Sequence, residues 1–250
     1  MARLPIYNRC TGNPHSSMTK TKSGVVPAQD GFSLIPNRKL LAMYAAMLQC
    51  RRMAEGARGK SKNKSPNDLI LGHEAAAVGA TMDLLSHDTI APGLWPDGVV
   101  KAINPAASIV SSVSIATRSA VADRDGKRIT LLFSSSKVNS QSSWLKALAL
   151  AAEHDLPMLF VSLDRNAGSD SQVNGAPIPM KKNGSALPVI MVDGNDVVAV
   201  YRVASESITH ARKGYGPTLI DCRLSLSGDP IENMHKYLIG KGLDPGTFNA

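Results

Sequence analysis

Four short runs of almost unbroken apolar residues constrain the fold more than any other feature of the chain. A strand with one face in water alternates apolar and polar side chains, whereas a parallel strand covered by helices on both faces reads as a continuous apolar run. The runs therefore predict buried strands of a parallel sheet. They lie at residues 127–133 (KRITLLF), 156–163 (LPMLFVSL), 187–194 (LPVIMVDG) and 217–224 (PTLIDCRL).

Segments with helical periodicity separate these runs. The alternation predicts an α/β fold, a doubly wound and mostly parallel sheet flanked by helices. A short further strand is expected at residues 88–93 and a loop at 166–187. Helices are expected at residues 37–59, 65–88, 106–121, 141–154, 195–216 (capped by Asn195 and closed by Gly214) and 229–242.

The sequence predicts one domain with a leading segment. Residues 1–36 are basic and are expected to be poorly ordered: up to residue 29 they carry Arg3, Arg9, Lys20 and Lys22 and no acid. Residues 37–250 are expected to form a single α/β domain, since they are long enough to bury a sizeable core.

A second basic stretch, residues 51–64, holds six cations and one acid, Glu55, in a chain with a formal charge of +8. No aromatic residue lies between these charges, and 60–67 has no helical or strand periodicity. A solvated loop is the favoured interpretation. The alternative is an anion-binding or nucleic-acid-binding patch, whose affinity would fall steeply with salt.

Three widely spaced cysteines, Cys10, Cys50 and Cys222, form no CxxC or Cys/His pattern. This favours a reducing compartment and no metal cluster. No apolar run reaches the length of a membrane span, and the N-terminus lacks the apolar core typical of a signal peptide. We therefore expect a cytoplasmic protein without a membrane segment.

Residue types alone specify no reaction. His73-Glu74 is not part of an HExxH motif and is more typical of a helix start, and Asp193, Asn195 and Asp196 indicate a turn and a helix cap. At LLFSSSKVNSQ (131–141) a strand runs into a serine-rich loop and then a helix, a junction at which phosphates often bind. This junction has no glycine to admit a phosphate and no acid to hold a metal.

Five blocks, in order over about residues 38–243, together carry a family resemblance. The blocks are KLLAMYAAMLQCRRMAE, LGHEAAAVGATMDLLSHDTIAP, ALALAAEHDLPMLFV, VDGNDVVAVYRVASESITHARKGYGPTLID and DPIENMHKYLIGKGL. With these blocks the chain resembles the α subunit of the thiamine-diphosphate-dependent 2-oxo acid dehydrogenase E1 component, of the pyruvate, branched-chain or acetoin type. The resemblance implies a thiamine-diphosphate-binding α/β fold, with thiamine diphosphate and Mg²⁺ as cofactors. It also implies an E1β-like partner, or self-association, and transfer of the acyl group to a lipoyl-bearing E2.

The family's metal motif departs from its usual form here. Its Gly-Asp-Gly falls on Ser135, Ser136 and Lys137. Its Asn-Asn falls on Asp164 and Arg165, with Asn166 in reach of a one-residue slip, and its backbone-carbonyl position falls on Ala167. Mg²⁺ prefers hard oxygen ligands, which a serine and an arginine supply poorly. No catalytic residue is identified, because the family's histidine after the last strand has no counterpart in RLSLSGDP.

These departures favour a pseudoenzyme or scaffold subunit that has lost metal and thiamine diphosphate binding. The first alternative is an active subunit in which Lys137 and Arg165 hold the diphosphate in place of Mg²⁺. A weaker version has the same residues hold another anion, and the last alternative is nucleic-acid binding through residues 51–64. The small-residue faces of 72–80 and 106–120 are expected to pack against a partner or, equally well, within the chain.

Overall fold

A computed structural model gives the fold of the chain, and residues 31–250 form one compact unit. The predicted segment 1–36 lies outside the described residues except for Ile35, which is buried, and Pro36, whose carbonyl accepts the first helical hydrogen bonds. The structure describes residues 35–58, 71–91, 100–134, 141–163, 172–224 and 228–248, with short gaps at 102, 105–107, 111, 124, 126–127, 174–175, 178, 180 and 182–183.

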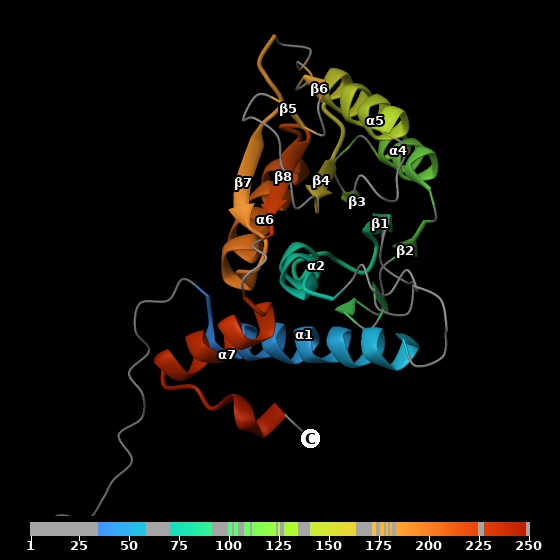
Figure 1. Cartoon of the computed structure of the whole chain (residues 1–250). Helices are drawn as coiled ribbons and strands as arrows, with labels where there is room; N and C mark the ends of the chain where they lie inside the picture. The colour runs from blue at the N-terminus through green and yellow to red at the C-terminus, as the bar shows by residue number, and fades with distance from the viewer. Residues whose placement is uncertain are drawn as a thin grey trace, which may run out of the picture. The chain divides into compact units, whose positions relative to one another are not determined.

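A six-stranded, entirely parallel sheet runs through the molecule (Figure 1), and the predicted α/β architecture is confirmed. A separate two-stranded hairpin, β5 (Gln172–Val173) and β6 (Ala176–Pro177), lies within the predicted loop 166–187. In spatial order the strands of the large sheet are β2 (Ser108–Ile109), β1 (Thr89–Ala91), β3 (Thr130–Ser134), β4 (Met158–Ser162), β8 (Thr218–Arg223) and β7 (Val189–Asp193).

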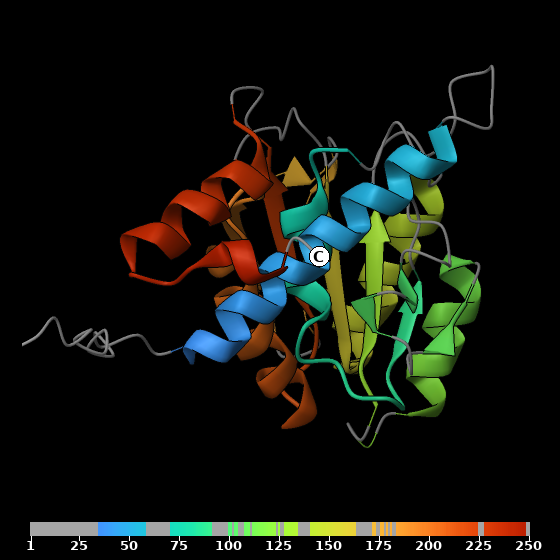
Figure 2. The same cartoon turned by 90° about the horizontal axis from the view of Figure 1, so that it is seen from below.

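Helices cover both faces of this sheet. On one face lie α4 (Val113–Ala122) and α5 (Gln141–His154). On the other lie α2 (Glu74–Thr81) and α6 (Val197–Arg212), and beyond them α1 (Asn37–Arg58) and α7 (Pro230–Gly240). A 3₁₀ turn, η2 (Pro245–Phe248), follows α7. Figure 2 shows α1 crossing in front of the sheet when the molecule is seen from below.

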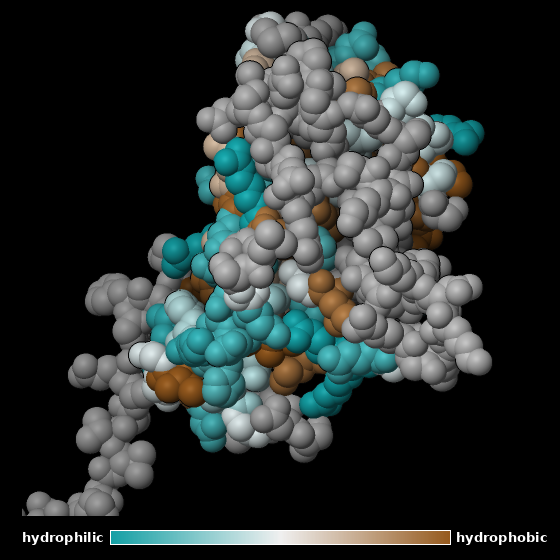
Figure 3. Space-filling model, viewed as in Figure 1, coloured by the Kyte–Doolittle hydropathy of each residue, from teal (hydrophilic) through white to brown (hydrophobic). Residues whose placement is uncertain are grey.

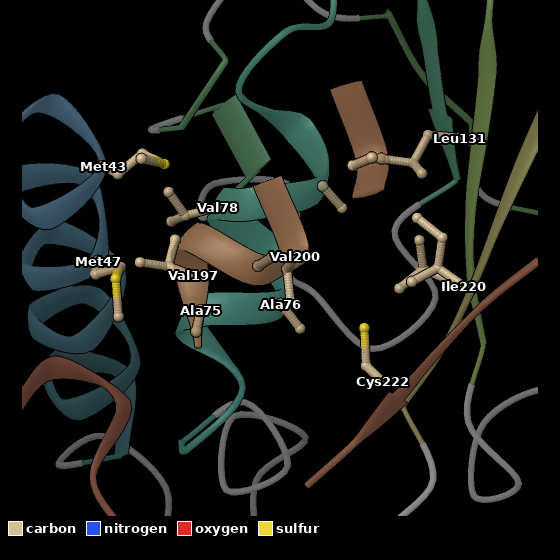
Figure 4. Packing of buried hydrophobic residues seen from close by; sticks show 14 of the residues in the cluster. Met43, Met47, Ala75, Ala76, Val78, Leu131, Val197, Val200, Ile220 and Cys222 are labelled. Atoms are coloured by element: carbon tan, nitrogen blue, oxygen red, sulfur yellow. The ribbon is translucent and has the colours of Figure 1, made fainter. Parts of the chain in front are cut away.

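Two apolar cores result, one on each face of the sheet. Alternate residues of the central strands enter each core: Leu131 and Ile220 face α1, α2 and α6, whereas Leu132, Phe160 and Leu219 face α4 and α5. In the first core, Met43 and Met47 of α1 point toward α2 and α6 (Figure 4). The continuous apolar runs of the sequence are the consequence of this double burial.

The predicted helix at 65–88 is wrong in its extent. Only Glu74–Thr81 is helical among the described residues of that range, and all eight residues are buried. Residues 82–88 form turns, because the Asp88 carboxylate accepts a hydrogen bond from the Leu85 N–H (2.7 Å) and so closes a tight connection into β1. The sequence did not reveal that α2 ends at Thr81, because the small residues of 75–80 run on into the apolar Met82, Leu84 and Leu85 without an intervening glycine or proline.

The predicted helix at 106–121 begins later than expected. Residues 108–109 form β2, and the helix starts at Val113, because the Ser112 hydroxyl accepts the Ile115 N–H (3.3 Å) as an N-cap. A hydroxyl at the N-cap satisfies an N–H group that would otherwise have no helical partner.

The cap of α6 is also corrected. Asp196, not Asn195, accepts the N–H groups of Val198 (2.9 Å) and Ala199 (3.1 Å). The predicted end at Gly214 is confirmed: this glycine has a φ of +79°, and its N–H donates to the Ala211 carbonyl. Glycine reaches this left-handed conformation without the steric cost of a side chain.

Candidate cofactor-binding edge of the sheet

The carboxyl ends of β3 and β4 lie side by side. The two strands pair along their full length, with Ser134 opposite Ser162, and the Leu163 N–H donates to the Ser134 carbonyl (2.9 Å). The loops that carry the predicted site residues start directly after these ends. All seven of those residues lie outside the described part of the chain, so their positions stay predictions: Ser135, Ser136, Lys137, Asp164, Arg165, Asn166 and Ala167.

A row of buried polar residues crosses the sheet at this edge. Ser134, Ser162 and Asp221 are Cα partners on the neighbouring strands β3, β4 and β8, and they are 2%, 1% and 9% exposed. We call these three residues the carboxyl-edge polar row. Because side chains alternate between the faces of a strand, the row lies on the same sheet face as the apolar row two residues earlier, Leu132, Phe160 and Leu219.

The row ends in an acid that the sequence analysis did not select. Asp221 lies on β8, and its Oδ2 is 3.5 Å from Nε of Arg223, a half-exposed residue two positions later on the same face. The signal available in the sequence was a single acid inside the apolar run PTLIDCRL. Nothing in that run says that β8 lies next to β4, which is what brings Asp221 beside Ser162.

An ion-pair network joins the three helices α1, α2 and α7. Arg51 Nε donates to Glu74 (2.6 Å), and its two terminal nitrogens donate to Asp229 (2.7 and 3.1 Å). The Gly72 N–H also donates to Glu74, which is fully buried. The hydrogen bonds from Arg51 hold the pKa of Asp229 below its usual range. The hydrogen bond from Arg51 to Glu74 raises the pKa of Arg51 above its usual value. The network fixes the starts of α2 and α7.

The structure corrects the interpretation of a solvated loop for residues 51–58, the first part of the basic stretch 51–64. Residues 51–58 belong to α1, and Arg51 is largely buried in its ion pairs. Residues 59–64 lie outside the described residues. Residues 51–58 therefore follow the helix predicted at 37–59 rather than the loop interpretation, and Ala54 is one of its buried positions.

Two smaller motifs behave as predicted. His73 occupies the N-cap position of α2 and Glu74 is its first residue, so the pair marks a helix start. The Asp193 carboxylate accepts the Asn195 N–H (2.9 Å) in a turn before the Asp196 cap. Within the described ranges, no three His, Cys, Asp or Glu residues gather as a metal-binding group.

The small-residue faces pack within the chain. The face of α2 is buried against α6 and α1, and Ala116, Thr117 and Ala120 of α4 are buried toward α5 and the sheet. The outer face of α4 still exposes Ile115 and Val121. Of the two uses expected for these faces, intramolecular packing is the one observed.

A sequence profile of the dehydrogenase E1 component matches residues 98–224, just over half of the chain. The chain belongs to this family. The matched residues run from before β2 to the end of β8 and so include the ends of β3 and β4. The resemblance read from the five sequence blocks is thereby confirmed.

Several named proteins are similar over part of their length. The α subunit of acetoin:2,6-dichlorophenolindophenol oxidoreductase of Bacillus subtilis is 34% identical over 100 residues, which cover 38% of this chain and 30% of that protein. The pyruvate dehydrogenase E1 α-3 subunit of Arabidopsis thaliana chloroplasts is 33% identical over 109 residues (42% and 26%). The 3-methyl-2-oxobutanoate dehydrogenase α subunit of Mycobacterium tuberculosis is 36% identical over 101 residues (39% and 28%). The matched part is thus less than a third of each relative.

Among solved structures, a Mycobacterium smegmatis protein described as thiamin diphosphate-dependent is similar over 62% of this chain and 32% of its own. The identity is 17% and the TM-score is 0.40, which is too low to support an inference about function.

Across the described residues, no helix is both long and apolar enough to cross a lipid bilayer.

Proposed function

We propose that the chain is the α-type subunit of an E1 component that acts on a 2-oxo acid or acetoin together with a β-type subunit. The observation that carries this proposal is the family match over the strands that form the candidate cofactor edge. The relatives named above are themselves α subunits of acetoin, pyruvate and 3-methyl-2-oxobutanoate enzymes. A lipoyl-bearing E2 would be a partner only of an active enzyme.

In this function the diphosphate of thiamine diphosphate is held at the carboxyl edge of β3 and β4 by groups other than the family motif. Lys137 and Arg165 follow the two paired strand ends in the sequence and would offset the phosphate charge, Arg165 in a bidentate manner. When bound, the cofactor supplies an electron sink for decarboxylation. The carboxyl-edge polar row supports retained binding, because it keeps hydrogen-bonding groups at this edge.

The competing function is a pseudoenzyme that has lost metal and cofactor and serves as a scaffold for the β-type subunit. The replacement of the family's metal ligands by Ser136 and Arg165, taken by itself, predicts this function. Nucleic-acid binding through residues 51–64 has less support, because Arg51 is engaged in ion pairs inside the chain. A cytoplasmic location is supported by two buried free thiols, Cys50 and Cys222, which suit a reducing compartment.

Calorimetric titration of thiamine diphosphate separates these functions. The purified chain is titrated with and without Mg²⁺, alone and with a β-type subunit. Binding that weakens at least tenfold in Arg165→Ala or Lys137→Ala, and is unchanged in Arg118→Ala on the exposed face of α4, would support the proposed function. No binding under any condition, with a stable complex by size-exclusion chromatography, would overturn it in favour of the scaffold.

A further inference from the structure

We propose that the outer edge of β7 is an interface for a second copy of this chain, paired antiparallel about a two-fold axis at Met191. β7 (Val189–Asp193) is the last strand of the six-stranded sheet, with β8 as its neighbour on the inner side. In Figure 1 it forms the left edge of that sheet. The pairing would join two sheets into one continuous sheet. The inference goes beyond the proposed function and does not depend on cofactor binding.

The backbone of β7 turns every second residue toward β8. The Leu219 N–H donates to the Pro188 carbonyl (2.9 Å), and the Gly194 N–H donates to the Arg223 carbonyl (2.8 Å). Even-numbered residues therefore bond to β8, in agreement with the register of the two strands. Hydrogen-bonding directions alternate along a strand of a parallel pair. Three residues of β7 thus point their N–H and C=O groups away from the sheet: Val189, Met191 and Asp193.

This outward row is open in the part of the chain that the structure describes. Just before the row, the Leu187 N–H donates to the Pro179 carbonyl (3.1 Å). Beyond that bond, no described residue hydrogen-bonds to the outward groups of Val189 and Met191. An unpaired row of backbone groups on an apolar strand is a template for pairing with another strand.

Side chains on both faces of the strand are exposed as well. Ile190 is 37% exposed and Met191 is 48% exposed, and consecutive residues of a strand point to opposite faces. Their Cα partners on β8, Ile220 and Asp221, are buried. Neither face of the middle of β7 is therefore fully covered by helices. An apolar strand that is accessible along its edge and on both faces fits another extended apolar strand.

The edge is self-complementary, which favours a second copy over another partner. With Met191 opposite Met191 of the second copy, an antiparallel ladder pairs Val189 with Asp193 of the copy, so every outward N–H faces a carbonyl. The Asp193 carbonyl already accepts the Asp196 N–H (3.2 Å), but a carbonyl oxygen has two lone pairs. On the other face, Ile190 would lie opposite Val192 of the copy and gain an apolar contact.

The charge of the strand permits this register. Asp193 is the only charged residue of β7, and it would lie opposite a valine. The two Asp193 residues would be four positions apart along the ladder, about 14 Å, which exceeds the screening length of about 8 Å at physiological salt. The paired edges are short, and small interfaces are weak. We therefore expect a dimer that forms as the protein concentration rises.

Sedimentation velocity of the full chain, between about 1 and 100 µM, tests for this dimer. Met191→Lys should raise the dissociation constant about tenfold, because it places two ammonium groups directly opposite each other. Met191→Glu should have the same effect through two carboxylates. An equimolar mixture of the two variants should dimerise again, since the axis at Met191 places opposite charges against each other.

Ile239→Lys is the matched control, because it adds the same charge at an exposed apolar residue of α7; it should dimerise as wild type does. Circular dichroism confirms that each variant is folded. A wild type that stays monomeric, or a Met191→Lys variant that dimerises as wild type does, would overturn the inference. The proposed function would then stand, because cofactor titration tests it separately. Single variants that are monomeric and do not associate when mixed would refute the axis at Met191.

Discussion

Arg51 joins α1 to α2 and α7 through all three nitrogens of its guanidinium group. One of its partners, Glu74, is fully buried and also caps the turn at Gly72. The negative charge of Glu74 stabilises the fold, because removing one member of a buried ion pair leaves the charge of the other member uncompensated.

Glu74→Gln should therefore lower the free energy of unfolding by about 2–4 kcal/mol, somewhat less than a fully buried pair would lose, because Asp229 still holds Arg51. Urea unfolding followed by circular dichroism measures this. Glu232→Gln is the control: its pair with Lys236 in α7 is solvent-exposed, and the expected change is below about 0.5 kcal/mol. Equal effects of the two substitutions would contradict the role given to Glu74.

At the scale of elements, α2 is the centre of the larger core. It lies between α1 and α6 (Figures 1 and 4). All eight of its residues are buried, and those from Ala75 to Ala80 are small and apolar, as expected of a helix that is buried all round. Gly79 permits the close approach of α6: a Cβ at this position would lie 2.8 Å from Cβ and Cγ1 of Val200.

Gly79→Ala should destabilise the protein by about 1–3 kcal/mol, because the α2–α6 contact must open to admit the methyl group. Gly56→Ala in α1 is the matched control, since nothing lies within 4 Å of its Cβ position. There the change should stabilise by about 0.5–1 kcal/mol through helix propensity. Thermal unfolding of both variants measures the difference.

Val200→Ala should recover part of the loss in the Gly79→Ala background, because it removes Cγ1, one of the two clashing atoms of Val200, while Cβ remains. If the double variant is less stable than the sum of the two single changes, the clash is not the cause.

For the whole molecule, the two cores share the strands β3, β4 and β8. These strands contribute Leu131 and Leu159 to one core and Leu132 and Phe160 to the other. Hydrophilic residues predominate where α1 reaches the surface in Figure 3. Arg38, Gln49 and Arg52 of α1 are exposed. Loss of either core would therefore expose one apolar face of the shared strands.

The two cores should therefore unfold in one transition. Trp144 lies in the α4–α5 core in a T-shaped contact with Phe160, with a ring-centroid distance of 5.1 Å. In a Trp95→Phe background, Trp144 fluorescence reports this core alone. Its urea midpoint should coincide with that of the reactivity of the two buried thiols, Cys50 and Cys222, which both lie in the other core. Separate midpoints would mean that the two faces of the sheet unfold independently.

The sequence by itself determined the elements whose signal is local. The bounds of α5, Gln141–His154, were predicted as observed, and the strands at 130–134, 158–162, 189–193 and 218–223 all lie within or against the predicted runs. Burial on both faces leaves its mark on each strand separately, so a continuous apolar run is enough to find it. The family resemblance came from such local blocks as well.

Tertiary structure alone decided which of these segments are neighbours. β8 follows β7 in the sequence but inserts between β7 and β4, and this places Asp221 in one row with Ser162 and Ser134. The end of α2 at Thr81 and the pairing of Arg51 with Asp229 were hidden for the same reason. Apolar patterns record how deeply a residue is buried, but strand order and ion pairs depend on packing between residues far apart in the chain.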